Sequence, residues 1–413
     1  MTKKVRTGAH LRLLYFVFFI GMGSSGPFAS IFLKRVLVGP SGRPAIELIG
    51  ILYTILPFVG ILASMSASIV ADKFHLGRKV IAYCCIIAGL SAIMLGQSAE
   101  PWTGAWALDK RFIFILASSL IYGFGVGPIN GLLDAETLHF LNATNAREKY
   151  GNFRLWGTYG WFVSTIVMGA LLTRFLDLAL IYYGAAAGCL MLGIATLFRM
   201  SNAGVPRLDK IPFSHLRDNR RFQIFLVYIF LYGLIYNMTF NYLGYFFDDI
   251  MSSFWQMGLI FGTWTIFEIP VMMFSHKLIR RFGNRRIIVV GLTINAVRLI
   301  LFATFTMKTP YLYKFLVALL QGPGYAFTQI GVIDYIDRQA HQNMRATYLN
   351  VANLAQNTLG ASVGGILGSV IIKELGSTAM FRLSGIAILG LVIFFLVAVK
   401  SENIKSVPWT TDT

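Results

Sequence analysis

The chain consists almost entirely of apolar runs that are each long enough to cross a lipid bilayer. A membrane-spanning helix needs about 20 mostly apolar residues, and such runs follow one another along the whole sequence. Apolar residues make up 56% of the 413 positions and charged residues 13%, whereas a soluble domain carries about a quarter charged residues. The sequence therefore predicts an all-α integral membrane protein with twelve spans. We place these spans at 11–33, 47–71, 79–97, 112–135, 152–174, 177–198, 222–246, 255–277, 286–306, 312–334, 347–371 and 380–399.

The basic residues indicate how the spans are oriented. A net charge of +18 suggests a nucleic-acid partner at first sight. With the N-terminus inside, however, the larger share of Lys and Arg falls in loops on the cytoplasmic side, as the positive-inside rule describes. We therefore expect cytoplasmic termini and a lipid bilayer as the partner, with no nucleic acid. The polar, basic segment 199–221 is predicted to be a cytoplasmic linker between an N-terminal bundle, 1–198, and a C-terminal bundle, 222–413.

The sequence shows no pattern that is typical of an enzyme. We find no nucleophile–base set, no metal-ligand spacing and no phosphate-binding loop. Cys84, Cys85 and Cys189 fall inside predicted spans without disulfide or metal spacing, so we expect them to be packing residues. We predict neither enzymatic activity nor a metal or cofactor.

Charged residues at the junction of two spans mark the first candidate site. Asp134 and Glu136 end one apolar run, and Arg154 and Trp161 lie near the start of the next. Ionisable groups at membrane depth are costly to bury and indicate a substrate or ion site with a nearby partner. We take Glu136 and Arg154 as the candidate pair, and Arg154 and Trp161, seven residues apart, share one helix face. The alternative is a static ion pair that holds the helices together.

Polar residues in the second half form the opposing candidate surface. Asn237 and Asn241 share one face of their predicted helix, although they could equally hydrogen-bond between helices. Glu268 and Arg298 lie at similar depths in neighbouring spans and could pair, either around a substrate or as a static ion pair.

Glycine and proline interrupt several predicted spans. Residues 21–27 combine Gly, Ser and Pro in the first span, and residues 125–128 and 321–324 do so at corresponding positions of the two halves. Interrupted segments at matching positions are typical of a binding site near the middle of the membrane.

Two basic loops at corresponding positions resemble the loop that links helices 2 and 3 in the major facilitator superfamily, Gly-x-x-x-Asp-Arg-x-Gly-Arg-Lys. Residues 68–79 match this pattern, although Ser68 replaces the first Gly and two extra residues precede the second. A second copy without the Asp occurs at 280–286. The resemblance implies two parallel six-helix bundles around a central site. The residues that we assign to this cytoplasmic gate loop are Asp72, Gly77, Arg78, Arg281 and Gly283.

Within the superfamily, residues 130–161 resemble the lactose-permease-like branch of oligosaccharide, nucleoside and aromatic-acid proton symporters. That branch has a Glu, an Arg eighteen residues later and a Trp seven residues beyond, which is the spacing of Glu136, Arg154 and Trp161. The resemblance implies that the Glu and Arg hydrogen-bond the substrate and that the Trp stacks on its ring. Related carriers often have an Asp at the position of Asp134, so we retain both carboxylates.

The second half departs from that branch. The His and Glu that carry proton coupling in helix 10 are replaced by Gln321 and Gly324, and the Lys of helix 11 is replaced by Asn357. If the protein is coupled to protons, another carboxylate must titrate, and Asp334 joins the candidates. The substrate-binding residues that we predict are Glu136, Arg154, Trp161, Asn237, Asn241, Glu268, Gln321 and Asn357. The proton-coupling or ion-pair residues are Asp134, Glu136, Glu268 and Arg298.

These observations predict a monomeric secondary active transporter in the cell or inner membrane. We expect proton-coupled symport of a small polar, ring-bearing solute of the sugar or nucleoside class by alternating access. One alternative, favoured by Gln321 and Gly324, is an uncoupled facilitator or an exporter of an aromatic or organic acid. Another is a membrane sensor that has this fold but does not transport.

Overall fold

The computed structural model describes residues 3–74, 76–146, 149–199, 219–340 and 344–399. These residues form helices joined by short connections, with an isolated bridge between Val38 and Pro44. The first half contains α1 (Lys3–Ser25), η1 (Gly26–Phe28), α2 (Ala29–Val36), α3 (Ile46–Phe74), α4 (Gly77–Gln97), α5 (Pro101–Gly104), α6 (Leu108–Asn142), α7 (Tyr150–Phe175) and α8 (Leu180–Arg199). The second half contains α10 (Arg220–Asn241), α11 (Leu243–Ile250), α12 (Phe254–Met273), α13 (Ser275–Phe282), α14 (Asn284–Phe302), α15 (Tyr311–Leu319), α16 (Gln321–Gln339), α17 (Arg345–Asn353), η4 (Leu354–Leu359), α18 (Gly360–Leu375) and α19 (Ser377–Ala398).

Ten helical segments of the described residues are long and apolar enough to cross a membrane. They coincide with ten of the twelve predicted spans to within a few residues at most ends. The other two predicted spans, 255–277 and 286–306, correspond to α12 and α14, helices of 20 and 19 residues that are not among the ten. Twelve spans therefore remain a prediction. The predicted linker 199–221 lies mostly outside the described residues, so the boundary between bundles also remains a prediction.

Two of the three predicted interruptions of the spans are present in the structure, and one is not. The Gly/Pro run in the first span produces η1, a 3-10 turn at Gly26–Phe28, and α15 gives way to α16 at Leu320. The interruption predicted at 125–128 is wrong, because α6 runs unbroken through Pro128. The glycines there serve close packing instead, since a Cβ on Gly125 would lie 2.6 Å from the backbone nitrogen of Ala88 in α4.

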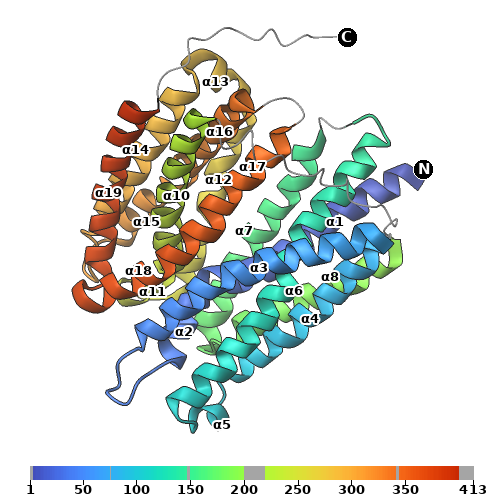
Figure 1. The fold of residues 1–413 in the computed structure, drawn as a ribbon. Helices are drawn as coiled ribbons and strands as arrows, with labels where there is room; N and C mark the ends of the chain where they lie inside the picture. The colour runs from blue at the N-terminus through green and yellow to red at the C-terminus, as the bar shows by residue number, and fades with distance from the viewer. Residues whose placement is uncertain (1–2, 75, 147–148, 200–218, 341–343, 400–413) are drawn as a thin grey trace.

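The helices form two groups that correspond to the two halves of the chain (Figure 1). In the first group α1 packs on α7 and α8, and α4 packs on α6 and α8. In the second group α14 packs on α16 and α19, and α10 packs on α18. Large apolar side chains such as Leu62, Tyr83 and Ile393 are exposed on the outside of these groups, as a surface in contact with lipid requires.

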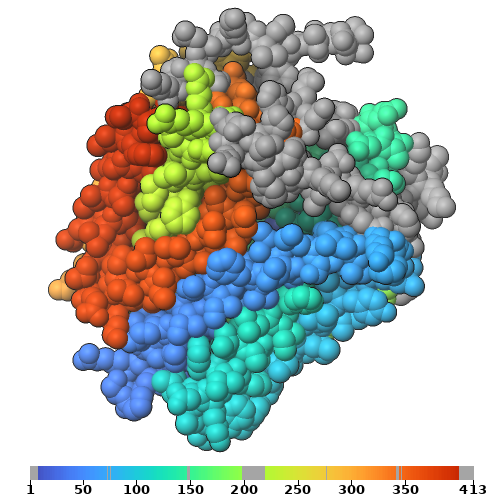
Figure 2. Space-filling view, viewed as in Figure 1, coloured from blue at the N-terminus to red at the C-terminus, as the bar shows by residue number. Residues whose placement is uncertain are grey.

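The two groups meet at the end of the molecule that is opposite to the start of α1 and the end of α19, which we call the distal end (Figure 1). The contacts there join α7 to α12 and α3 to α18, and Figure 2 shows α18 lying along α3. The backbones of α7 and α12 touch. A Cβ on Gly258 would lie 2.5 Å from the carbonyl oxygen of Thr165 and 3.1 Å from the Cα of Gly169. The halves are therefore closed tightly at the distal end.

The close contact between α7 and α12 predicts that a larger side chain at Gly258 destabilises the protein. Gly258→Val places a branched side chain where backbone already lies, so we expect a destabilisation of ~1–3 kcal/mol, as for other overpacked sites. The melting temperature in detergent should fall by several degrees. Gly390→Val in α19 is the matched control, because nothing lies within 4 Å of a Cβ at that position. Equal melting temperatures for the two variants would contradict the close contact.

Candidate substrate-binding site

Three helices of the first half bring a polar group together. The hydroxyl of the fully buried Tyr15 in α1 donates a hydrogen bond of 2.6 Å to Oδ1 of Asp134 in α6. The guanidinium of Arg154 in α7 lies over the ring of Phe19, 4.5 Å from its centroid, and 5.8 Å from that of Tyr15. Tyr150 interacts electrostatically with both Asp134 and Arg154. Asp134 and Arg154 are thus held in one cluster through aromatic side chains.

Trp161 lies where the two halves meet. Its indole N–H donates a hydrogen bond of 3.2 Å to the carbonyl oxygen of Phe261 in α12, and its ring lies against Gly26 of η1. Phe28 of the same turn makes an edge-to-face contact with the ring of Phe261. In this conformation the indole is part of the barrier between the centre of the molecule and the distal end.

The second half contains a small polar cavity of about 10 Å³, room for about one water molecule. Arg298 and Gln321 face it, and each is only 4% exposed. Gln321 Nε2 donates to the hydroxyl of Tyr236 at 3.3 Å. Arg298 Nε and Gln321 Oε1 have no hydrogen-bond partner within the described part of the chain, so a donor and an acceptor both remain available. The residues that line the cavity are Tyr236, Thr239, Phe240, Leu243, Arg298 and Gln321.

Glu268 connects this region to the first half. The side chain is half-buried in α12 and interacts electrostatically with Tyr236 and Tyr325. Tyr325 of α16 also lies within electrostatic range of Arg154. Tyr325 therefore brings a hydroxyl of the second half near the polar group of the first.

The predicted pairs fare differently. No ion pair joins Glu268 to Arg298 among those that the described residues make. Glu136 is buried, so its pairing with Arg154 stays a prediction, whereas Asp134, two residues earlier on another helix face, belongs to the Arg154 cluster. In the second half, α16 packs against both α12 and α14 and so separates Glu268 from Arg298.

The other predicted binding residues lie apart from this centre or use their polar atoms on backbone. Asn237 Nδ2 donates to the carbonyl oxygens of Gly233 and Gln356, at 2.8 and 3.1 Å, and thereby joins α10 to η4. Asn241 is half-buried at the end of α10. Asn357 is exposed and donates to Asn353 Oδ1 in its own helix.

The predicted gate loops lie at the end of the molecule opposite to the distal end. Gly77 is the buried first residue of α4, followed by Arg78, and the structure does not describe the side chain of Asp72. In the second copy, Arg281 lies over the ring of Phe282. Gly283 links α13 to α14 with a φ of 76°, a backbone conformation that favours glycine. Asp334 pairs with Arg338 in α16, Nε to Oδ2 2.7 Å, which places it outside the central cluster.

Sequence reasoning missed Tyr15. In the sequence Tyr15 differs from its neighbours, Leu14 to Ile20, only by a hydroxyl group. A single tyrosine in an apolar span is common and does not by itself indicate a site. The partner on α6 is 119 residues away, so the pattern alone could not indicate it.

Helices that can span a membrane, packed in two groups that each contain buried polar side chains, define a multi-pass integral membrane protein. The chain belongs to the MFS_1-like family, whose model matches residues 9–383, and is a transporter of the major facilitator superfamily.

Several transporters are similar to this chain along nearly its whole length. It is 23% identical to the maltose permease of Geobacillus stearothermophilus, over 95% of this chain and 94% of that one. The sucrose permease of Escherichia coli is 24% identical, with the same coverage of 95% and 94%. The crystal structure of the nucleoside transporter NupG superposes with a TM-score of 0.79 at 20% identity, over 97% of this chain and 100% of that one. At this identity the structural likeness shows the fold.

The hydrogen bond between Tyr15 and Asp134 predicts that removing the Tyr15 hydroxyl lowers the stability of the protein. Tyr15→Phe keeps the ring beside Arg154 but removes the hydrogen bond to the Asp134 side chain, which is worth ~0.5–1.5 kcal/mol. We expect a lower melting temperature. Tyr228→Phe is the control, because the buried Tyr228 hydroxyl has no hydrogen-bond partner within the described part of the chain, and its loss should be neutral or stabilising. The same shift in both variants would contradict the assigned hydrogen bond.

Proposed function

We propose that the protein transports a small polar, ring-bearing solute of the sugar or nucleoside class by alternating access. The observation that supports this proposal is a polar group in each half. Asp134 and Arg154 belong to the first half and Arg298 and Gln321 to the second, and Tyr325 of the second half lies within electrostatic range of Arg154 and Glu268. A solute bound between them would contact both halves, as rocking of the halves around a central site requires.

The side chains at this place suit a hydroxylated ring. A guanidinium and a carboxylate can hydrogen-bond hydroxyl groups with charge-assisted geometry, and an indole offers an apolar face to a ring. Arg298 Nε can donate and Gln321 Oε1 can accept, which together match a hydroxyl that does both. The similar permeases are named for maltose and sucrose and the similar structure for nucleosides, which supports this class.

We assign the substrate contacts to Glu136, Arg154, Trp161, Glu268 and Gln321, with Asn237, Asn241 and Asn357 at the edge of the site. Trp161 would stack on the ring once its hydrogen bond to Phe261 is released. The end opposite to the distal end would face the cytoplasm, so the closed distal end gives an inward-facing conformation. The protein would work as a monomer.

Coupling to protons is part of the proposal. Burial destabilises a carboxylate and a nearby Arg stabilises it, so a carboxylate that approaches and leaves an Arg during the cycle can bind and release a proton. We assign the exchanged proton to Asp134 or Glu268, with Glu136 and Arg298 as the further ionisable groups of the two halves.

An uncoupled facilitator or an exporter of an aromatic or organic acid is the second candidate. Its support is Arg298, which makes no ion pair with a carboxylate among the described residues and so could bind an anionic substrate. Uptake that is insensitive to an imposed pH gradient would select this candidate. A sensor would bind solute without exchanging it across the membrane.

Arg154→Gln tests the central site. Counterflow in proteoliposomes, with labelled sugars and nucleosides as solutes, measures exchange without needing a proton gradient. Removing the guanidinium removes the charged donor of the first half, so we expect counterflow to fall at least tenfold, a loss of about 1.4 kcal/mol or more in transition-state binding. Arg174→Gln, at the exposed end of the same helix, should behave as the wild type. Normal counterflow with Arg154→Gln would refute the assignment.

A further inference from the structure

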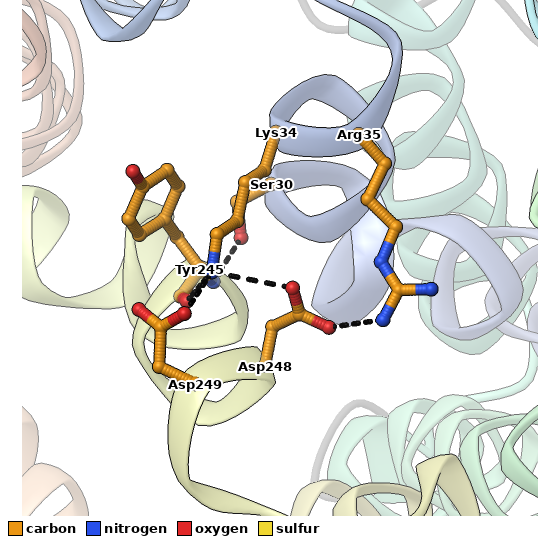
Figure 3. Close-up of polar contacts among 6 residues, drawn as sticks. All are labelled: Ser30, Lys34, Arg35, Tyr245, Asp248 and Asp249. Carbon is orange, nitrogen blue, oxygen red and sulfur yellow. Dashed lines mark hydrogen bonds and ion pairs between the residues drawn. The ribbon is translucent and has the colours of Figure 1, made fainter. Parts of the chain in front are cut away.

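Two short helices cross-link the halves at the distal end through four charged side chains (Figure 3). Lys34 and Arg35 belong to α2, which ends the first span, and Asp248 and Asp249 belong to α11, which ends the corresponding span of the second half. Lys34 Nζ lies 3.2 Å from Asp248 Oδ2 and also pairs with Asp249. Arg35 Nη2 lies 2.6 Å from Asp248 Oδ1. Asp248 is thus bound by both cations.

Further contacts fix the geometry of these pairs. The backbone N–H of Tyr245 donates to Ser30 Oγ at 3.0 Å, and Lys34 Nζ donates to the carbonyl oxygen of Tyr245 at 3.3 Å. The Lys34 ammonium also lies 4.4 Å from the centroid of the Tyr245 ring. One face of α2 is therefore complementary to one face of α11 in hydrogen bonds as well as in charge.

Each helix is also fastened to its own half. Arg111, in the first turn of α6, donates to the carbonyl oxygen of Val36 at the end of α2, at 2.9 Å. In the second half Lys314, in the first turn of α15, donates to the carbonyl oxygen of Ile250 at the end of α11, at 2.6 Å. A cation at a helix C-terminus is favourable for the helix itself. If the halves rock apart, α2 and α11 will therefore separate from one another, each moving with its own half.

The four charged side chains differ in burial, and this difference ranks how strongly each holds the two helices together. The side chains of Lys34 and Asp248 are 11% and 9% exposed, whereas those of Arg35 and Asp249 are 48% and 50% exposed. Removing one partner of a buried ion pair is costly because the other charge is left uncompensated, but exposed pairs contribute little. A second ion pair between the halves, Glu47 with Lys373 of α18, is about 50% exposed on both sides and should matter little.

We infer that Lys34, Arg35, Asp248 and Asp249 form an electrostatic latch that holds the distal end closed and must break whenever that end opens. The buried Lys34–Asp248 pair provides most of the effect. The latch sets the balance between the two conformations of the transport cycle independently of the solute that is carried. This inference rests on the alternating access proposed above, but not on the proposed substrate class.

The test measures the distance across the distal end by electron–electron double resonance. Spin labels are attached at Ser41→Cys and Lys308→Cys, exposed positions in the loops after α2 and before α15, with the buried Cys84, Cys85 and Cys189 replaced by Ala. Asp248→Asn should increase the ratio of long to short distances about tenfold or more, since Asp248 is the less exposed of the two carboxylates and pairs with both Lys34 and Arg35. Asp249→Asn should have a smaller effect.

Two further variants make the result specific. Glu47→Gln removes the exposed ion pair between the same halves and should leave the distances unchanged. A variant with exchanged charges, Lys34→Asp, Arg35→Asp, Asp248→Lys and Asp249→Lys, should return the distribution toward short distances. A distribution for Asp248→Asn that matches Glu47→Gln would overturn the latch, and so would opening that persists in the charge-exchanged variant. Loss of counterflow in Arg154→Gln is a separate readout, so the latch and the substrate site can fail independently.

Discussion

Close contact between the two halves at the distal end is the feature on which the other properties of this molecule depend. Within the described residues, α7 meets α12 at backbone distance through Gly169 and Gly258, and α3 meets α18 beside them. At Gly169 and Gly258 the α7–α12 contact is made by backbone atoms, which leaves little room for a gradual movement there. A rigid contact of this kind is either closed or open. The charges on α2 and α11 add a directional interaction to this packing, because they pair in the closed arrangement.

Each half also holds polar and charged side chains away from solvent. Asp134 and Arg154 are stabilised by tyrosines of the first half, and Arg298 and Gln321 keep unused hydrogen-bonding atoms around a small cavity in the second. Polar groups left unsatisfied at this depth cost free energy, which a bound solute can recover. Because that solute would contact both halves, its binding energy would be linked to the movement of one half against the other.

The positions of the helices could be predicted because a bilayer requires long apolar runs, and the ten confirmed segments follow these runs closely. The centre could be predicted only in part. Glu136 and Arg154 have the spacing of a known pattern, but α6 extends to Asn142, and Asp134 is the carboxylate in the Arg154 cluster. Glu268 and Arg298 have similar depths, yet depth along two helices does not specify which faces meet. The latch could have been predicted, because a basic pair, Lys34 and Arg35, and an acidic pair, Asp248 and Asp249, follow corresponding spans of the two halves.

The most direct test of the account is a thermal-shift screen of sugars, nucleosides and aromatic carboxylates, followed by removal of one polar group from each half. A ligand that binds between the halves should raise the melting temperature of the wild type, because ligands stabilise the state to which they bind. Its effect should be lost both in Arg154→Gln and in Gln321→Ala, since each half supplies part of the site. A ligand that stabilises both variants as much as the wild type would contradict a shared central site.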